Sequence, residues 1–198
     1  MMAKICGITN LGDALAAIDC GASALGFNFY PKSPRYVSEE TAAGIVATLP
    51  PSVCKVGVFV NETPDRVSDS VSRAGLDVAQ IHGDVSYPRG IRVWHAVSAR
   101  PGFRLDSLDA LPADAFLLDT PSDILFGGTG ETFDWSIAAG SPKRIIIAGG
   151  LDASNVRLAI ERARPWGVDA CSRIECAPGR KDHSKMAAFL KAALAENL

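Results

Sequence analysis

The chain has little of what marks a membrane, secreted or nucleic-acid-binding protein. Its 198 residues carry a formal net charge of −2, so bulk electrostatics give no reason to expect a nucleic-acid partner. It has no apolar run of about 18 residues, the length that a membrane-spanning helix needs. The opening apolar run is too short for a secretory signal, and it is followed by Gly7 and Thr9. We therefore expect a cytoplasmic protein that binds neither membranes nor nucleic acid.

Paired cysteines are also missing. The sequence has five cysteines, which is an odd number, and no two of them form a C-x-x-C pair. Reduced thiols fit this pattern better than a disulfide framework does, and the spacing typical of zinc ligands is absent. We expect no metal and no cofactor, and a thiol oxidoreductase is a poor candidate.

The chain does contain enough apolar sequence for one sizeable core. Apolar residues make up 47% of the sequence, and 198 residues is an ordinary length for one domain. No low-complexity segment or convincing internal repeat marks a boundary. We expect a single catalytic domain over residues 1–198.

Eight short apolar runs recur along the chain and mostly alternate with segments of helical spacing. Their nearly continuous apolar character is typical of strands in a buried parallel sheet. The runs are Ala3–Cys6, Ala24–Asn28, Lys55–Val60, Val78–Ile81, Arg92–Val97, Phe116–Asp119, 144–152 and 167–172. This alternation predicts a single closed (β/α)8 barrel, known as a TIM barrel, with a doubly wound open sheet as the alternative.

Helix signals accompany most of these runs. Ser38 is a suitable N-cap for a helix over Glu39–Leu49, and Thr63 followed by Pro64 begins a helix that ends at Ala74. Further helices are expected over 13–19, over 155–163 and from about residue 182. The connections between the fourth, fifth and sixth runs leave room only for short or irregular helices.

Polar and small residues gather just after the predicted strands. In a barrel the carboxyl ends of all strands meet at one rim, where active sites are built. Three segments rich in small residues follow the last three strands, where backbone N–H groups can surround a phosphate. They are Gly127-Gly-Thr-Gly130, Gly149-Gly150 and residues 170–173. Residues 121–134 are long for a connection, which indicates a functional loop.

Seven motifs, in order along the whole chain, resemble those of the phosphoribosylanthranilate isomerase family. They are Lys4-Ile-Cys-Gly-Ile-Thr9, Ser33-Pro-Arg-Tyr-Val37, Val58-Phe-Val-Asn61, Gln80-Ile-His-Gly83, Gly127-Gly-Thr-Gly130 with Phe133-Asp-Trp135, Ala148-Gly-Gly-Leu151 and Pro178-Gly-Arg-Lys-Asp182. One of these motifs alone would be weak evidence, whereas the set in register is specific.

The resemblance implies an aldose–ketose isomerase of tryptophan biosynthesis. Such an enzyme converts N-(5'-phosphoribosyl)anthranilate to 1-(o-carboxyphenylamino)-1-deoxyribulose 5-phosphate by an Amadori rearrangement. By resemblance, Cys6 is the catalytic base, Asp119 is the catalytic acid and Arg35 binds the anthranilate carboxylate. The other predicted site positions come from the residues that follow the strands. They are Asn61, Gln80 and His82 at the rim, with Gly128, Thr129, Gly130, Gly149, Gly150, Ser172 and Arg173 at the phosphate.

The chemistry of the side chains agrees with these roles. A thiol is a useful base only as a thiolate, so the pKa of Cys6 must be tuned, whereas that of Asp119 must be raised if it is to stay protonated. Taken alone, Cys6 would more often be a small buried hydrophobe. His82 would either contact the substrate or satisfy backbone groups. Ordinary packing is the expected role of the remaining cysteines, which are Cys20, Cys54, Cys171 and Cys176.

Two positions depart from the family pattern. The loop after the last strand usually resembles Ser-Ser-Gly-Val-Glu, but here it is Cys171-Ser-Arg-Ile-Glu175, so Arg173 replaces a glycine. Position 131, usually basic or neutral, is Glu131. Arg173 is strained if this position needs a positive φ. Otherwise its charge lies near the phosphate, and we hypothesise that it pairs with Glu131 or offsets it.

Two other functions compete with this one. A histidine-pathway aminoaldose isomerase has similar chemistry but uses two aspartates in a longer barrel, and Cys6 argues against it. A non-catalytic phosphosugar-binding barrel would have no need of both Cys6 and Asp119. The expected partner is a small phosphosugar substrate, and the expected assembly is a monomer or a homodimer.

Overall fold

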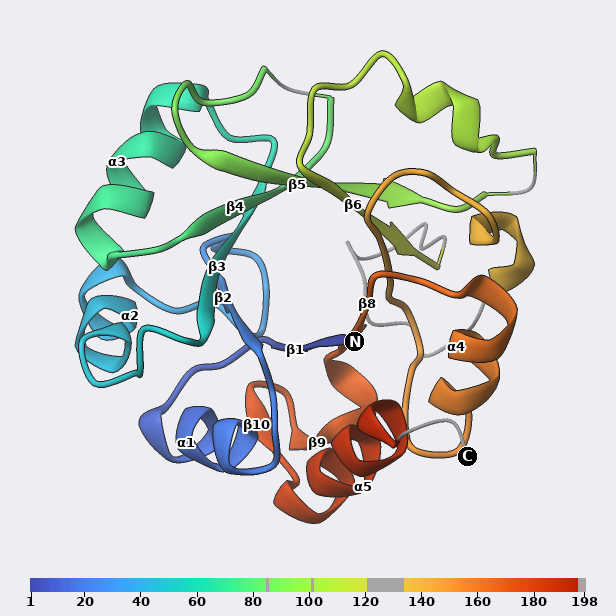
Figure 1. Ribbon diagram of the computed structural model, residues 1–198. Helices are drawn as coiled ribbons and strands as arrows, with labels where there is room; N and C mark the ends of the chain where they lie inside the picture. Colours follow the sequence, from blue (N-terminus) through green and yellow to red (C-terminus); the bar gives the residue numbers. More distant parts are fainter. Residues whose placement is uncertain (85, 101, 121–133, 196–198) are drawn as a thin grey trace.

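The protein is a barrel of eight strands surrounded by helices (Figure 1). The computed structural model describes residues 1–84, 86–100, 102–120 and 134–195. The barrel strands are β1 (Met2–Cys6), β2 (Ala24–Asn28), β3 (Cys54–Val60), β4 (Val78–His82), β5 (Arg92–Ser98), β6 (Ala115–Asp119), β7 (Ile145–Ile147) and β8 (Gly167–Ala170). All eight predicted strands are present, and the TIM barrel is confirmed.

The barrel closes because the first strand pairs with the eighth. Strand β1 lies parallel to β2, with Lys4 opposite Ala24, and parallel to β8, with Ile5 opposite Ala170. The remaining strands pair in parallel, each with the next along the chain. This closure excludes the doubly wound open sheet, and it brings the carboxyl ends of the strands to one rim.

The α-helices lie outside the barrel, close to their predicted positions. They are α1 (Leu11–Asp19), α2 (Glu39–Val46), α3 (Pro64–Ala74), α4 (Val156–Ala163) and α5 (His183–Leu194). The predicted caps form, since the hydroxyl of Ser38 accepts from the Thr41 N–H and that of Thr63 from the Arg66 N–H. Helix α2 ends three residues before the predicted Leu49. There the Thr48 and Leu49 N–H groups donate to carbonyls three residues back, which tightens the chain before Pro50.

The connections expected to be irregular are irregular. A 3-10 turn, η1 (Leu105–Leu108), lies between β5 and β6. A further 3-10 turn, η2 (Trp135–Ala138), precedes β7 and was not predicted. Between β4 and β5 no α-helix occurs in the described part of the chain. Among the described residues, no helix is both long and apolar enough to cross a membrane.

A small hairpin after β8 was not predicted. The turn η3 (Ser172–Ile174) leads into β9 (Glu175–Ala177), which pairs antiparallel with β10 (Arg180–Lys181). The buried carboxylate of Asp13 in α1 accepts the Lys181 N–H at 2.8 Å. This bond fixes the hairpin against the first helix, beside the rim.

Among the described residues, two apolar clusters hold the fold together. The larger one lies between strands and helices and includes Phe27, Phe116 and Phe189, none more than 1% exposed. The smaller one contains Val56 and Leu117, whose side chains point to the opposite face of their strands, into the barrel. Polar side chains such as Gln80, Asp119 and Asp169 lie at the rim end of the barrel interior.

Candidate active site

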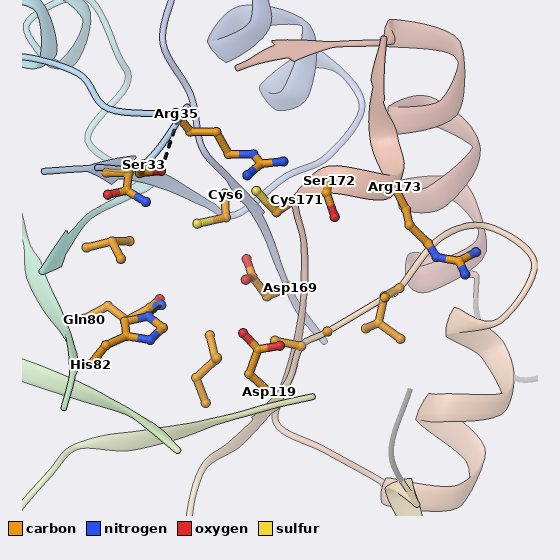
Figure 2. Close-up of a pocket in the computed structure, with 17 residues that line it drawn as sticks. Cys6, Ser33, Arg35, Gln80, His82, Asp119, Asp169, Cys171, Ser172 and Arg173 are labelled. Carbon is orange, nitrogen blue, oxygen red and sulfur yellow. Dashed lines mark hydrogen bonds between the residues drawn. The ribbon is translucent and has the colours of Figure 1, made fainter. Parts of the chain in front are cut away.

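One pocket opens at the rim and brings most of the predicted site residues together (Figure 2). Those that line it are Cys6, Arg35, Gln80, His82, Asp119, Gly149, Gly150, Ser172 and Arg173. Asn61 does not line it. Gly128, Thr129, Gly130 and Glu131 lie outside the described residues.

Cys6 ends β1 directly above a buried ion pair. Lys4 lies two residues earlier on the same face of the strand, is fully buried, and places its Nζ 2.9 Å from Asp169 Oδ1 of β8. Gly26 of β2 makes room for both side chains. A Cβ at that position would lie 2.8 Å from Cys6 Sγ and 3.1 Å from Lys4 Nζ.

This environment favours a thiolate at Cys6. A hydrogen bond with the Cys171 thiol holds the pKa of Cys6 well below its usual range. Burial opposes the shift, and the positive charges of Lys4 and Lys181 add to it. The same contact with Cys6, together with burial, raises the pKa of Cys171, so Cys171 keeps its proton.

Asp119 ends β6 on another wall of the same pocket (Figure 2). Burial raises its pKa to about 6, and the nearby charge of Cys6 acts in the same direction. A hydrogen bond from the Thr120 N–H to Oδ1, at 2.8 Å, and the charge of Lys4 oppose the shift. Cys6 and Asp119 thus have pKa values moved in opposite directions, as a base and an acid require.

His82 and Gln80 form a neutral polar pair at the end of β4. Burial, followed by the charge of Lys4, lowers the pKa of His82 to about 4. The Gln80 amide nitrogen lies 2.9 Å from His82 Nε2 and donates to it. Asn61 lies next to this pair, with φ of 51° and its N–H donating to the His82 carbonyl. It therefore contacts the backbone of the rim.

Arg35 is fixed over the pocket by the hairpin. Its Nε lies 2.9 Å from Glu175 Oε1 and its Nη2 2.8 Å from Oε2, which is a bidentate pair. Glu175 also accepts from the Lys181 ammonium at 2.9 Å. One buried carboxylate thus holds two cations, and the planar guanidinium has a set orientation.

The loops after β7 and β8 form a further wall of the pocket. Gly149 and Gly150 both have positive φ, 80° and 64°, and the Asn155 amide donates to the Gly150 carbonyl at 2.8 Å. A Cβ on Gly149 would lie 2.6 Å from Asp119 Oδ1, so a glycine is required beside the proposed acid. Ser172 follows in η3.

Arg173 is not strained. It lies in η3, and the non-glycine residues of positive φ in the described chain are Asn61 and Arg164. Its Nη1 lies 2.7 Å from Asp152 Oδ2 in the loop after β7, so the two loops are joined by an ion pair. The hypothesised partner, Glu131, lies outside the described residues.

Sequence reasoning missed a set of buried polar side chains beneath and beside the pocket. They are Lys4, Asp169, Glu175 and Lys181, and the partly exposed Cys171 lies beside them. Lys4 and Asp169 had a detectable signal, since a charge inside a buried strand needs a partner. Glu175 and Lys181 had no comparable signal, because the hairpin that carries them is too short to show a pattern.

Comparison with known proteins agrees with the motifs. Residues 3–192 match the family model described as N-(5'phosphoribosyl)anthranilate (PRA) isomerase. The curated N-(5'-phosphoribosyl)anthranilate isomerase of Solibacter usitatus is 56% identical, and the match covers 98% of each chain.

Solved structures show the same similarity. Phosphoribosyl anthranilate isomerase from Thermotoga maritima superposes with a TM-score of 0.86 and is 41% identical. The superposition covers 98% of each chain. A phosphoribosyl anthranilate isomerase solved with reduced 1-(o-carboxyphenylamino)-1-deoxyribulose 5-phosphate has a TM-score of 0.82, is 40% identical, and also has 98% coverage of both chains.

Proposed function

The chain belongs to the N-(5'-phosphoribosyl)anthranilate isomerase family, and from this premise we propose that its rim pocket performs the Amadori rearrangement with Cys6 as base and Asp119 as acid. The substrate is a phosphosugar that carries an anthranilate group. The reaction moves hydrogen within one molecule, so proton transfers by these two side chains complete it.

The first step opens the furanose ring. Asp119 donates its proton to the ring oxygen, the bond from that oxygen to C1' breaks, and the nitrogen lone pair forms a protonated Schiff base. A carboxyl group can do this only if it keeps its proton near neutral pH. Its pKa of about 6, raised by burial, supports this role.

The second step removes the C2' proton. The Cys6 thiolate takes it, the electron pair moves into a C1'–C2' double bond, and the iminium nitrogen becomes neutral. The resulting enolamine then tautomerises to the ketone. The thiolate persists in a buried site because the Cys171 hydrogen bond and the positive charges of Lys4 and Lys181 lower the pKa of Cys6.

The remaining pocket residues hold the two ends of the substrate. The Arg35 guanidinium, oriented by Glu175, suits a planar anthranilate carboxylate. The backbone N–H groups at Gly149, Gly150 and Ser172, with the Arg173 charge, suit the phosphate. The predicted Gly128, Thr129 and Gly130 would complete that phosphate site from the segment outside the described residues.

The observation that carries this proposal is the placement of Cys6 and Asp119 on one pocket with oppositely shifted pKa values. The test follows loss of fluorescence of the anthranilate conjugate for Cys6→Ala and Asp119→Asn. Each variant should lose on the order of 10²–10⁴ in kcat, because each removes one proton-transfer group. Full turnover by Cys6→Ala would overturn the proposal and favour a binding barrel.

The choice of substrate is tested by chromatographic separation of substrate from product, because only the anthranilate conjugate carries the fluorophore. The histidine-pathway aminoaldose is offered to the native enzyme beside the anthranilate conjugate. We expect turnover of the anthranilate conjugate. Activity confined to the histidine-pathway compound would instead reject the proposed substrate. The assembly, predicted as a monomer or homodimer, is measured by sedimentation.

A further inference from the structure

The pocket contains a second thiol beside the proposed base. Cys6 and Cys171 directly follow Ile5 and Ala170, which lie opposite each other in the β1–β8 pairing. Neighbouring strands are about 4.8 Å apart, which lies within the roughly 4.4–6.8 Å between Cα atoms that a disulfide spans. Both cysteines line the pocket, and both are free thiols (Figure 2).

Contacts at the strand ends keep the two sulfurs close. The side chains of Cys6 and Cys171 share a hydrogen bond. Gly7, immediately after Cys6, has a φ of 75°, and a Cβ there would lie 3.1 Å from Cys171 Sγ. The Cys171 sulfur therefore lies against the backbone next to Cys6, without an intervening side chain.

Two cations lie near this pair. Lys181 Nζ is 3.2 Å from the Cys171 carbonyl oxygen and 4.0 Å from its sulfur. The side chain of Arg35 passes close to the same backbone, with its Cδ methylene 2.8 Å from the position of a Cβ on Gly7, and its charge lowers the pKa of Cys171. These cations stabilise a negative charge on one of the two sulfurs. A second negative charge is disfavoured, because two neighbouring thiolates would repel each other.

We propose that Cys6 and Cys171 form a reversible redox pair, which a peroxide converts into a disulfide that stops the isomerase. The loss of activity rests on the proposed role of Cys6 as the base, whereas formation of the disulfide does not. Cys171 is thereby a modification site, which gives it a role beyond the ordinary packing expected from the sequence.

The chemistry balances with hydrogen peroxide as the oxidant. The Cys6 thiolate attacks one peroxide oxygen, the O–O bond breaks, and with one proton taken up the products are a sulfenic acid and water. The Cys171 sulfur then attacks the Cys6 sulfur, the S–O bond breaks, and the Cys171 proton leaves with the hydroxide as a second water. Two thiols are oxidised by two electrons, and one peroxide is reduced to two waters.

The first oxidation prepares the second. While Cys6 is a thiolate, its hydrogen bond and its charge raise the pKa of Cys171 and keep that thiol protonated. Conversion to the neutral sulfenic acid removes both effects. The charges of Lys181 and Arg35, which lower the pKa of Cys171, then act unopposed except by burial. Cys171 becomes a better nucleophile at the moment when its target forms.

The experiment treats the whole enzyme with hydrogen peroxide and measures two quantities. Peptide mapping by mass spectrometry under non-reducing conditions should find the Cys6 and Cys171 peptides linked with loss of two hydrogens. The fluorescence assay should show turnover falling by at least about 100-fold, the lower end of what one proton-transfer group contributes. Dithiothreitol should restore both.

Two variants serve as controls. Cys171→Ser cannot form the link, so its Cys6 should oxidise further to sulfinic acid, and dithiothreitol should not restore its activity. Cys176→Ser, which removes an exposed thiol on β9, should behave as the native protein does. Each protein is compared with its own activity before oxidation.

The outcomes separate the two proposals. Absence of a Cys6–Cys171 link, or dithiothreitol recovery that is the same in Cys171→Ser, would overturn the redox pair. A quantitative link with unchanged turnover would leave the redox chemistry standing but would show that Cys6 is not the base. Formation of the link together with reversible loss of turnover supports both.

Discussion

Lys4 is the buried cation beneath Cys6, and after the Cys171 hydrogen bond its charge is the next largest effect that lowers the pKa of the thiol. A fully buried ammonium costs free energy unless it is paired, and Asp169 pairs it at 2.9 Å. Its charge also reaches the thiol, since Lys4 and Cys6 both lie against Gly26. One buried cation therefore favours the charged forms of both Asp169 and Cys6.

Replacing Lys4 by methionine should make Cys6 a weaker base. Loss of the positive charge raises the pKa of Cys6, and each unit above the assay pH lowers the thiolate fraction about tenfold. The pH dependence of Cys6 alkylation by iodoacetamide, followed by peptide mass spectrometry, measures the shift directly. The reaction should need a higher pH in Lys4→Met, and kcat should fall.

The control is Lys55→Met. Lys55 is also a largely buried strand lysine with an aspartate partner, Asp77, at 3.3 Å, but it lies at the start of β3, away from the rim. It should leave the alkylation profile of Cys6 unchanged. An unchanged profile in Lys4→Met as well would remove Lys4 from the mechanism.

Asp119 should lower the stability of the folded protein at high pH. Its pKa is raised from 3.8 to about 6, so the folded state binds more protons than the unfolded state between these values. The stabilisation is complete below pH 3.8 and is lost as the pH rises through 6. Asp119→Asn should therefore be more stable than the native protein at pH 8, by on the order of 1–3 kcal/mol.

Guanidinium unfolding at several pH values tests this. The difference between Asp119→Asn and the native protein should grow from pH 4 to pH 7 and then become constant. A difference that does not depend on pH would mean that the Asp119 carboxyl is not perturbed in the folded state.

At the scale of single elements, the loop after β7 shows how glycine supports the site. Gly149 has a φ of 80°, and its Cβ position would overlap the Thr120 hydroxyl, the Asp119 carboxylate and the Thr120 backbone. Gly140 has nearly the same φ, 76°, but no atom lies within 4 Å of its Cβ position. Both glycines have a positive φ, but only the Cβ position of Gly149 would contact other residues.

Alanine at each position should separate these effects. Both substitutions strain the backbone, by on the order of 1 kcal/mol, so both should unfold somewhat earlier in guanidinium. Only Gly149→Ala should lower kcat, because the new methyl group displaces Asp119. Equal kcat values for the two variants would show that Asp119 does not need its present position.

The sequence predicted the elements better than their pairings. Apolar runs and caps such as Ser38 and Thr63 are local signals, so the barrel strands and most helix ends were predictable. The ion pair of Lys4 and Asp169 joins residues 165 apart, and only barrel closure brings them together. The β9–β10 hairpin was missed because its residues are mostly polar and its position depends on contacts such as that between Lys181 and Asp13.

The candidate site was predictable to a similar degree. The motifs named the rim residues Cys6, Arg35 and Asp119, and the structure places all three on one pocket. A sequence cannot show that Glu175 holds Arg35, nor that Cys171 lies beside Cys6. Both facts arise from the register of β1 with β8 and from the hairpin that follows.

For the whole molecule, stability depends on the packing of the last helix, α5, against β1 and the helices α1 and α4. Phe189 of α5 is completely buried in the larger apolar cluster. Phe189→Ala should lower the free energy of unfolding by about 3–5 kcal/mol. A single guanidinium transition shifted to lower concentration is the expected result, with kcat of the protein that remains folded unchanged.

Leu158→Ala is the matched control. Leu158 lies on α4 but is 43% exposed, so its removal should change stability by less than about 1 kcal/mol. Equal losses in the two variants, or a biphasic transition in Phe189→Ala, would show that α5 is not part of one cooperative unit with the barrel.

The β1–β8 pairing also has a consequence for synthesis on the ribosome. Strand β1 emerges first, yet one of its two neighbours is made some 160 residues later, as the paired Met2 and Gly167 show. Until then, Lys4 has no counter-ion, and the groove that will receive substrate has no wall on one side. A nascent chain cut short before β8 should therefore be inactive and prone to capture by chaperones, whatever part of it has already folded.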